Sequence, residues 1–324
     1  MRIEIETIQE LNLKNWEKLL IESENSSFYH TCNWISVWKD SYSNFSPFFI
    51  VAKDNEKYLA GIPLVKVKKL GLSSFFSLPY ETYGGVISLK NTDESLPSNL
   101  CKKLVEFTKG LSLCRIRITD FQNSCDFLPN LGFDCFKVFT HLINLTEKKE
   151  DWEDFKQKKR GIVQAEKRGV LVQKINSFEQ VKSYFELVEK TSFRHGLKKT
   201  RHSLWFYQNI FSSLSKTDYL LWNLAYFEDK LLAGQINFIF KDTIYYWDGA
   251  SDESFWSFRP NDALFFEAID FALFQGLSFY NLGASPPDAS GLIQFKESWG
   301  GKRKTYWIYE KKTFWGKILN RIKK

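Results

Sequence analysis

Two segments far apart in the chain share one pattern of hydrophobic and polar positions. Residues 49–65 (FIVAKDNEKYLAGIPLV) and 224–239 (LAYFEDKLLAGQINFI) each contain an apolar run, a short polar stretch and a second apolar run. The tripeptide Leu-Ala-Gly stands at the corresponding place in both. Apolar runs of this length around a polar turn predict a β-hairpin, so we expect the same hairpin twice.

Each predicted hairpin is followed by the same succession of elements: a glycine-containing aromatic strand, a helix, the tripeptide Gly-Leu-Ser and a further strand. The segments are 80–86, 100–109, 110–112 and 113–118 in the first copy and 245–250, 262–275, 276–278 and 279–282 in the second. Glycine directly after a helix suits its left-handed C-terminal cap. The repeated order predicts an α+β fold of two units, each a mixed, mostly antiparallel sheet flanked by helices.

The helix predicted over 262–275 must pack on a sheet. Asn261 can cap its N-terminus, and its apolar residues recur at helical spacing: Leu264, Phe265, Ala268, Ile269, Ala272 and Leu273.

The region between the two copies is charged and predicts helices rather than strands. Residues 146–170 predict a helix that ends near Gly169, and 178–192 and 204–214 predict two more. A last strand is expected over 304–309. The predicted domains are 1–148 and 149–310, followed by a basic amphipathic segment, 311–324. A length of 324 residues agrees with two domains, because a single core rarely grows so large.

No apolar run in the sequence is long enough to span a membrane, and the N-terminal residues lack the apolar core of a secretion signal. We therefore expect a cytoplasmic protein. As a helix, residues 312–324 would place Phe314, Trp315, Ile318 and neighbouring apolar residues opposite basic ones, a pattern of helices that lie on membranes. This predicts peripheral contact with the inner membrane face; the alternative is that the apolar side packs on the first domain.

Cysteines and histidines predict neither disulfides nor a metal site. The five cysteines are odd in number and lack C-x-x-C spacing, so we expect reduced, buried side chains. The four histidines form no metal-binding motif. No tightly bound cofactor is predicted.

Positive charge is concentrated in residues 155–170, which hold six Lys or Arg and one Glu within a chain of net charge +7. Such a cluster attracts phosphates of a nucleic acid, a nucleotide or a lipid. The candidate phosphate-binding residues are Lys158, Lys159, Arg160, Lys167 and Arg168. The alternative is an ordinary solvated helix face.

Five short segments together resemble one protein family. They are 28–34 (FYHTCNW), 159–170 (KRGIVQAEKRGV), 189–194 (EKTSFR), 281–285 (NLGAS) and 295–301 (FKESWGG). In this order the chain resembles the FemAB-like family, the peptidoglycan bridge-forming aminoacyltransferases. Its members consist of two Gcn5-related N-acyltransferase (GNAT) domains and transfer aminoacyl or acyl groups to amines.

The resemblance implies two catalytic residues. Lys296 occupies the Phe-Lys motif of the family, which implies an ammonium that contacts the oxyanion or a terminal phosphate. The alternative is a lysine that extends past a buried Phe295 into solvent. Asp248 would accept a proton from the attacking amine or orient it, and the alternative is a turn residue before Gly249.

The resemblance also implies substrate-binding residues. Arg194 matches an arginine that faces the acceptor, although a surface arginine at a helix end explains it equally well. Tyr29, His30 and Trp34 match the acceptor pocket of the first domain, and an amphipathic helix is the alternative for Trp34. The other predicted substrate-binding residues are Tyr83, Tyr246, Phe295 and Trp299.

The donor is inferred from a departure from the common GNAT pattern. Coenzyme A-dependent members bind pyrophosphate on a glycine-containing loop at a helix N-terminus, but residues 254–263 (SFWSFRPNDA) contain no glycine. This favours an aminoacyl-tRNA or an acyl carrier as donor, and a nucleotide- or lipid-linked precursor of peptidoglycan or polysaccharide as acceptor. The alternatives are an acetyl-coenzyme A-dependent N-acetyltransferase acting on an amino sugar, and a non-catalytic protein that binds a glycan or partner.

Overall fold

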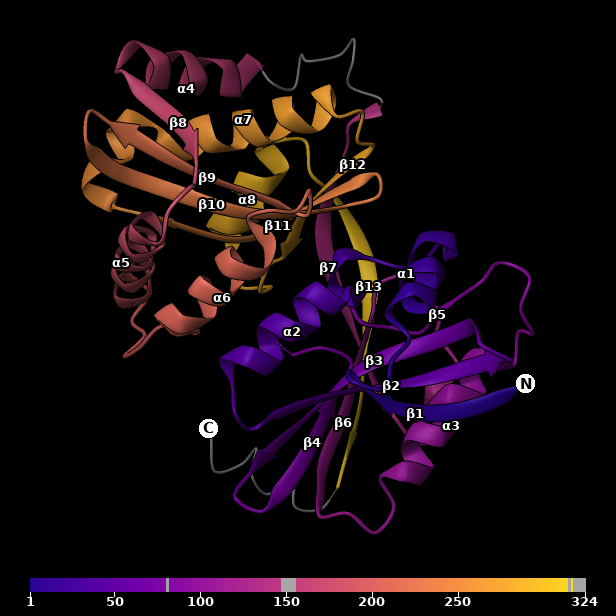
Figure 1. Ribbon diagram of the computed structural model, residues 1–324. Helices are drawn as coiled ribbons and strands as arrows, with labels where there is room; N and C mark the ends of the chain where they lie inside the picture. The colour runs from indigo at the N-terminus through magenta and orange to yellow at the C-terminus, as the bar shows by residue number, and fades with distance from the viewer. Residues whose placement is uncertain (80–81, 147–155, 314–315, 317–324) are drawn as a thin grey trace. The chain divides into compact units, whose positions relative to one another are not determined.

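The computed structural model describes residues 1–79, 82–146, 156–313 and 316, and Figure 1 shows their arrangement. The chain forms two compact units. Unit 1 comprises residues 1–138 and the described residues from Thr305 on, and unit 2 comprises residues 139–304. The sequence predicted boundaries at 148/149 and 310/311. The compact units divide earlier because strands β7 (Asp134–Asn144) and β13 (Lys302–Lys312) each run from one unit into the other.

Unit 1 is built on a sheet with the strand order β1-β2-β3-β4-β6-β13, in which only β4 and β6 pair in parallel. The strands are β1 (Arg2–Thr7), β2 (Phe45–Asp54), β3 (Lys57–Lys69), β4 (Leu72–Phe76), β6 (Leu113–Asp120) and β13, with the short β5 (Ile87–Ser88) beside β3. The helices are α1 (Leu13–Glu22), α2 (Cys32–Ser41) and α3 (Leu96–Phe107), with short 3-10 turns at Phe28–His30 and Leu128–Leu131.

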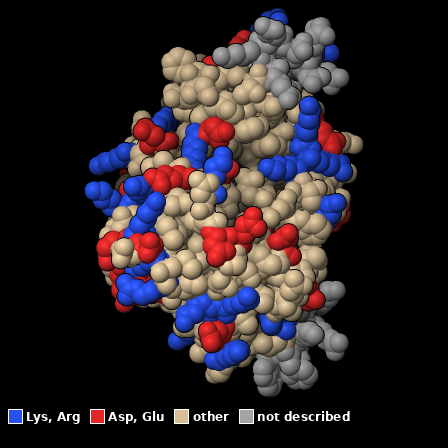
Figure 2. Space-filling model, turned by 90° about the vertical axis from the view of Figure 1, so that its right-hand side faces the viewer, with Lys and Arg blue, Asp and Glu red and all other residues tan. Residues whose placement is uncertain are grey.

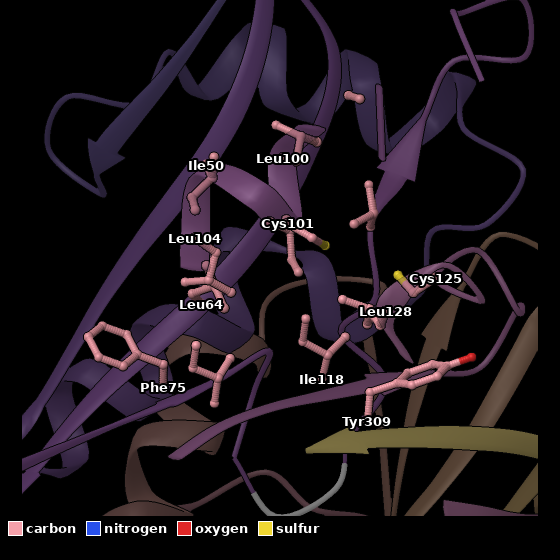
Figure 3. Packing of buried hydrophobic residues seen from close by; sticks show 14 of the residues in the cluster. Ile50, Leu64, Phe75, Leu100, Cys101, Leu104, Ile118, Cys125, Leu128 and Tyr309 are labelled. Carbon is pink, nitrogen blue, oxygen red and sulfur yellow. The ribbon is translucent and has the colours of Figure 1, made fainter. Parts of the chain in front are cut away.

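Helices cover both faces of the unit 1 sheet. Residues Phe48 and Ile50 of β2 pack with Leu100 of α3, whereas Phe49 meets the Trp16 ring of α1 at 4.9 Å between centroids on the opposite face. Figure 3 shows the α3 side of this core. A strand buried on both faces needs apolar side chains at every position, which explains the uninterrupted apolar run in β2.

Unit 2 has the strand order β7-β12-β11-β10-β9-β8. The strands after β7 are β8 (Val170–Lys174), β9 (Leu220–Phe227), β10 (Lys230–Phe240), β11 (Thr243–Ser251) and β12 (Phe279–Ala284). The helices are α4 (Lys156–Lys167), α5 (Phe178–Arg194), α6 (Leu204–Leu214), α7 (Pro260–Phe274) and α8 (Ser290–Ser298), with a 3-10 turn at Glu253–Phe258. In Figure 1, α7 lies on one face of the sheet with α4 above it, and α5 and α6 lie on the other face.

The predicted fold class is confirmed, because both units have mixed, mostly antiparallel sheets flanked by helices. The predicted helices over 178–192, 204–214 and 262–275 correspond to α5, α6 and α7. Both Gly-Leu-Ser tripeptides end a helix with glycine in the left-handed region, at φ +77° for Gly110 and +69° for Gly276. In each case the sequence placed the helix end correctly because only glycine adopts this conformation without strain.

Two predicted elements need a different description. The strand predicted over 80–86 is wrong for residues 82–86, which are irregular. Here Gly84 approaches the chain so closely that a Cβ would lie 1.9 Å from the Ser77 carbonyl oxygen, so the glycines serve close packing. The predicted C-terminal amphipathic helix lies almost wholly outside the described residues, and β13 continues as far as Lys312.

Candidate functional site

Strands β11 and β12 part from each other in the middle of unit 2. Their parallel pairing extends only from Thr243 and Phe279 to Tyr245 and Asn281. Beyond this point β11 contains a bulge at Trp247, since its neighbours on either side pair with consecutive residues of β10. We call residues 246–251 and 282–284 the fork. Bulges that interrupt a ladder are common beside active sites, because they free backbone groups and redirect side chains.

Lys296 reaches the fork from α8. Its side chain is buried, with 3% of the residue exposed, and its Nζ donates hydrogen bonds to the carbonyl oxygens of Gly283 at 2.8 Å and Ala284 at 2.9 Å. The alternative of a lysine extended into solvent is therefore wrong. An ammonium carries three N–H donors, so two are used by β12 and one remains for another acceptor.

The environment of Lys296 changes its protonation. Burial lowers the pKa of the Lys296 ammonium to about 8. Within the described residues no carboxylate forms an ion pair with its Nζ. An ammonium that is held in place by backbone oxygens and shielded from water suits the stabilisation of negative charge on a reacting carbonyl oxygen.

Asp248 is the other predicted catalytic residue, and it lies on the α5 and α6 side of the sheet. Its Oδ2 accepts hydrogen bonds from the hydroxyls of Tyr184 at 2.9 Å and Tyr207 at 3.0 Å. Burial raises the pKa of the Asp248 carboxyl, and the two tyrosine hydroxyls act in the opposite direction. No hydrogen bond or ion pair joins it to Lys296 in the described part of the chain.

The predicted aromatic residues of unit 2 form a packed group around Phe265 of α7. The ring centroids of Tyr246, Phe295 and Trp299 lie 5.5, 5.0 and 5.4 Å from that of Phe265. Trp299 is completely buried. The group therefore fixes α8, and with it Lys296, against α7.

Arg194 joins the end of α5 to the end of β11. Its Nη1 donates a hydrogen bond to the Ser251 carbonyl at 2.9 Å, and its guanidinium lies 4.9 Å from the Trp256 ring centre. These contacts account for the arginine within unit 2, and contact with an acceptor stays a prediction.

The four predicted substrate-binding residues of unit 1 come together in one buried group. Tyr29 lies 5.9 Å from Trp34 and 5.6 Å from Tyr83 between ring centroids. His30 accepts a hydrogen bond from the Ser27 backbone N–H through Nδ1, and its Nε2 donates to the Gly85 carbonyl. The structure thus brings these residues together, while their contact with a substrate stays a prediction.

A pocket of about 380 Å³ lies between α4, the N-terminus of α7 and the end of α8. Its lining residues are Lys158, Arg160, Gly161, Gln164, Arg259, Asp262 and Ser298. The Lys158 ammonium lies 4.7 Å from the Phe295 ring centre and 3.5 Å from the Asp262 carboxylate. Lys158 is thus held within unit 2 rather than on a solvated helix face.

The other candidate phosphate-binding residues are exposed. Lys159 and Arg160 lie near the start of α4, where Arg160 lines the pocket. Lys167 and Arg168 lie at the end of α4 and are not among the lining residues. On the face of the molecule shown in Figure 2, basic side chains are interspersed with acidic ones. That face therefore carries mixed charge rather than a continuous basic surface.

The N-terminus of α7 does not fit the pyrophosphate of coenzyme A. The carboxylate of Asp262 stands in the first turn of α7, where it benefits from the helix dipole and would repel a second anion. It also lies 4.0 Å from the Arg259 guanidinium. A Cβ on Gly161 would lie 2.5 Å from the Asp262 Oδ2, so α4 packs directly on this carboxylate.

Sequence reasoning missed three residues around the fork. Tyr184 and Tyr207 bind Asp248 from distant helices, and nothing in their helical patterns distinguishes them from core aromatics. His141 of β7 is completely buried, and its Nε2 lies 3.7 Å from the Glu297 carboxylate. A histidine near the apolar end of this strand, before Leu142 and Ile143, was the only available indication.

Comparison with known proteins defines the class. Residues 155–297 match the family described as acetyltransferase (GNAT) domain. These residues include α4, both strands of the fork and Lys296. No curated protein matches the chain in sequence. Residues 155–297 therefore form a GNAT acetyltransferase domain, which supports an acyltransferase activity.

Solved structures extend the likeness to both units. FemX shares 16% sequence identity with the chain, covers 99% of each chain and gives a TM-score of 0.73. The C-terminal domain of a putative lysylphosphatidylglycerol synthetase from Agrobacterium fabrum shares 13% identity, with a TM-score of 0.63 and coverage of 95% and 94%. A tandem GNAT protein from the clavulanic acid biosynthesis pathway shares 8% identity, with a TM-score of 0.60 and coverage of 96% and 98%. The predicted resemblance to FemAB-like tandem GNAT proteins is confirmed in the fold.

The described residues contain neither a membrane-spanning helix nor a metal-binding cluster. None of their helices combines the length and apolar character needed to cross a membrane. They also contain no group of three or more His, Cys, Asp or Glu side chains placed to hold a metal ion.

Proposed function

We propose that the protein transfers an aminoacyl or acyl group from an activated donor onto an amine of a cell-envelope precursor. The observation that carries this proposal is the buried Lys296 ammonium at the fork, held by two backbone carbonyls with a third N–H available.

In the proposed reaction the amine nitrogen bonds to the acyl carbon and the bond between that carbon and the donor oxygen breaks. The proton lost by the amine ends on the leaving hydroxyl, so the reaction needs no further reactant. Negative charge develops on the acyl oxygen in the tetrahedral state. The remaining N–H of Lys296 stabilises this charge. Asp248, with its raised pKa, is the candidate that orients the amine or accepts its proton.

Aminoacyl-tRNA is the donor that the site supports best. The pocket between α4 and α7 presents the cations of Lys158, Arg160 and Arg259 together with the carboxylate of Asp262. Three positive charges less one negative charge leave a net charge of +2, which suits the single negative charge of a phosphodiester near the end of a tRNA better than a pyrophosphate. Contacts of this kind make binding depend on salt concentration. The exposed Lys159, Lys167 and Arg168 are proposed to contribute phosphate contacts outside the pocket.

The acceptor is proposed to be a nucleotide- or lipid-linked precursor of peptidoglycan or polysaccharide. This follows the fold shared with FemX and with proteins named as lysylphosphatidylglycerol synthetases. Its binding residues are proposed to be Tyr29, His30, Trp34, Tyr83 and Arg194. The reaction is assigned to the cytoplasm. Contact of residues 311–324 with a membrane remains a prediction, since it concerns residues almost wholly outside the described ones.

A second candidate is an acetyl-coenzyme A-dependent N-acetyltransferase that acts on an amino sugar. The match to the acetyltransferase family favours it. The carboxylate of Asp262 at the start of α7 and the absence of glycine from residues 254–263 oppose it.

Donor binding and turnover separate these possibilities. Thermal-shift measurements with acetyl-coenzyme A, uncharged tRNA and aminoacyl-tRNA should show stabilisation by aminoacyl-tRNA. Transfer to a precursor amine should fall at least about a hundredfold in Lys296→Met and remain unchanged in Lys198→Met, a control in an exposed loop. Stabilisation by acetyl-coenzyme A alone would establish the second candidate. Full activity of Lys296→Met would remove Lys296 from the reaction, and no transfer by the wild type with any donor would indicate a non-catalytic binding protein.

A further inference from the structure

His141 lies behind the fork, next to the groups that hold Lys296. The register between β7 and β12 places two residues of β12, Leu282 and Gly283, opposite the single residue His141. The Gly283 carbonyl at this bulge, together with that of Ala284, accepts the hydrogen bonds of Lys296. The imidazole therefore stands at the strand position that sets the direction of these carbonyls.

The imidazole is enclosed and lacks a hydrogen-bond partner. Its side chain is 0% exposed, and neither ring nitrogen has a hydrogen bond in the described part of the chain. A Cβ on Gly301 would lie 3.1 Å from the His141 Cβ, so there is little spare room around it. A buried polar ring without partners costs free energy that a phenylalanine would avoid. Its polarity therefore calls for a functional explanation.

The charges that face His141 come from α8 and β13. Lys296 and Glu297 adjoin it from α8, and Arg303 of β13 binds Glu297 with its Nε and Nη2 each 2.9 Å from Oε1. Burial and then the charge of Lys296 lower the pKa of His141, while Glu297 raises it. A proton on His141 would place a second cation beside Lys296, and Glu297 already neutralises Arg303.

We infer that His141 is a positioning residue for Lys296: as a neutral imidazole it supports the bulge of β12 whose carbonyls hold the ammonium, and its protonation weakens that hold. The inference rests on the role proposed for Lys296 in acyl transfer. It gives transfer an acid limit set by His141 and an alkaline limit set by Lys296.

The hold on Lys296 can be measured without turnover. Trace acetylation of the full-length protein across a pH series, followed by mass spectrometry of the Lys296 peptide, gives the pKa of this amine. The wild type should give about 8. His141→Asn loosens the bulge and weakens the two carbonyl acceptors of the ammonium, so the pKa of Lys296 should fall by about one unit. His195→Asn, a change of an exposed histidine, should leave it unchanged.

Glu297→Gln is a second variant, at a partly exposed position that keeps its shape. Removal of the negative charge should lower the pKa of His141, seen in the NMR titration of its ring protons, and move the acid limit of transfer to lower pH. The inference is overturned if His141→Asn leaves the Lys296 pKa at its wild-type value, or if Glu297→Gln moves neither His141 nor the acid limit. Should Lys296→Met retain full turnover, the role proposed for Lys296 in transfer fails, while the acetylation experiment still decides whether His141 holds Lys296.

Discussion

The Lys158 ammonium lies 4.7 Å from the centre of the Phe295 ring, and Phe295 directly precedes Lys296 in α8. This contact joins the basic helix α4 to the element that carries the proposed oxyanion donor. Under the proposed function, a donor phosphate bound by Lys158 would contact the same helix that carries Lys296.

Replacement of Lys158 by Met should weaken binding of aminoacyl-tRNA and reduce the dependence of log K on log salt by about one ion. The ammonium proposed to contact the phosphate is lost while the apolar stem remains. Filter binding at several salt concentrations measures both quantities. Lys216→Met serves as the control, since Lys216 follows α6 and lies outside the pocket. An unchanged salt slope in Lys158→Met would remove Lys158 from the donor site.

The rate of transfer should fall as pH rises through about 8, the pKa of Lys296. Burial depresses this pKa below its ordinary value, so the ammonium loses its proton at a pH where an exposed lysine would keep it. Lys296→Arg keeps a positive charge to above about pH 12, so the activity that it retains should show no such alkaline decline. Initial rates from pH 6 to 10 with saturating donor test this. A decline at the same pH in both proteins would assign it to the acceptor or another group.

Asp248 should make the stability of the fold decrease as pH rises above its ordinary pKa of 3.8. Its pKa is raised in the folded state, so the folded protein binds the proton more tightly and loses this stabilisation as the carboxyl ionises. Asp248→Asn keeps an oxygen for the two tyrosines and cannot ionise. The difference in melting temperature between variant and wild type should therefore grow in favour of the variant from pH 4 to 7. A constant difference would contradict the raised pKa.

Gly234→Ala should destabilise the protein by about 1 to 3 kcal/mol, because overpacking displaces neighbouring groups. A Cβ at this position would lie 2.5 Å from Cδ2 of Tyr184, the residue that binds Asp248. The variant should therefore also alter the pH dependence described for Asp248. Gly291→Ala is the matched control, since no atom lies within 4 Å of its added Cβ. Denaturant unfolding of both variants gives the comparison.

Much of the fold could be predicted from local sequence patterns. The spacing of apolar residues in α7 and the glycines after α3 and α7 depend on neighbours within a few turns, and they were predicted well. The partners of Asp248 were not, because Tyr184 and Tyr207 lie 64 and 41 residues away along the chain. Their hydroxyls meet the carboxylate only when the sheet and its helices are assembled. His141 was missed for the same reason, since the bulge opposite it arises from the β7 and β12 register.

The Phe-Lys motif allowed Lys296 to be identified from the family resemblance, but it did not predict the surroundings of its side chain. The motif indicated Lys296, whereas its burial and its two carbonyl acceptors became apparent only in the structure. The basic segment was likewise recognised from its charge. Within this segment Lys158 is packed and Lys167 is exposed, because only one face of α4 lies on α7. The charge pattern alone does not specify that face.

Because β7 and β13 each pass from one unit into the other, neither half of the chain contains all the strands of its own sheet. β13 pairs with β6, and β7 pairs with β12. A fragment of residues 149–310 would leave β12 without its antiparallel neighbour, and a fragment of residues 1–148 would leave β6 with an open side. Such bared strand edges invite aggregation. Each half of the chain therefore supplies an edge-covering strand to the sheet of the other half, and neither half alone should fold into a soluble protein.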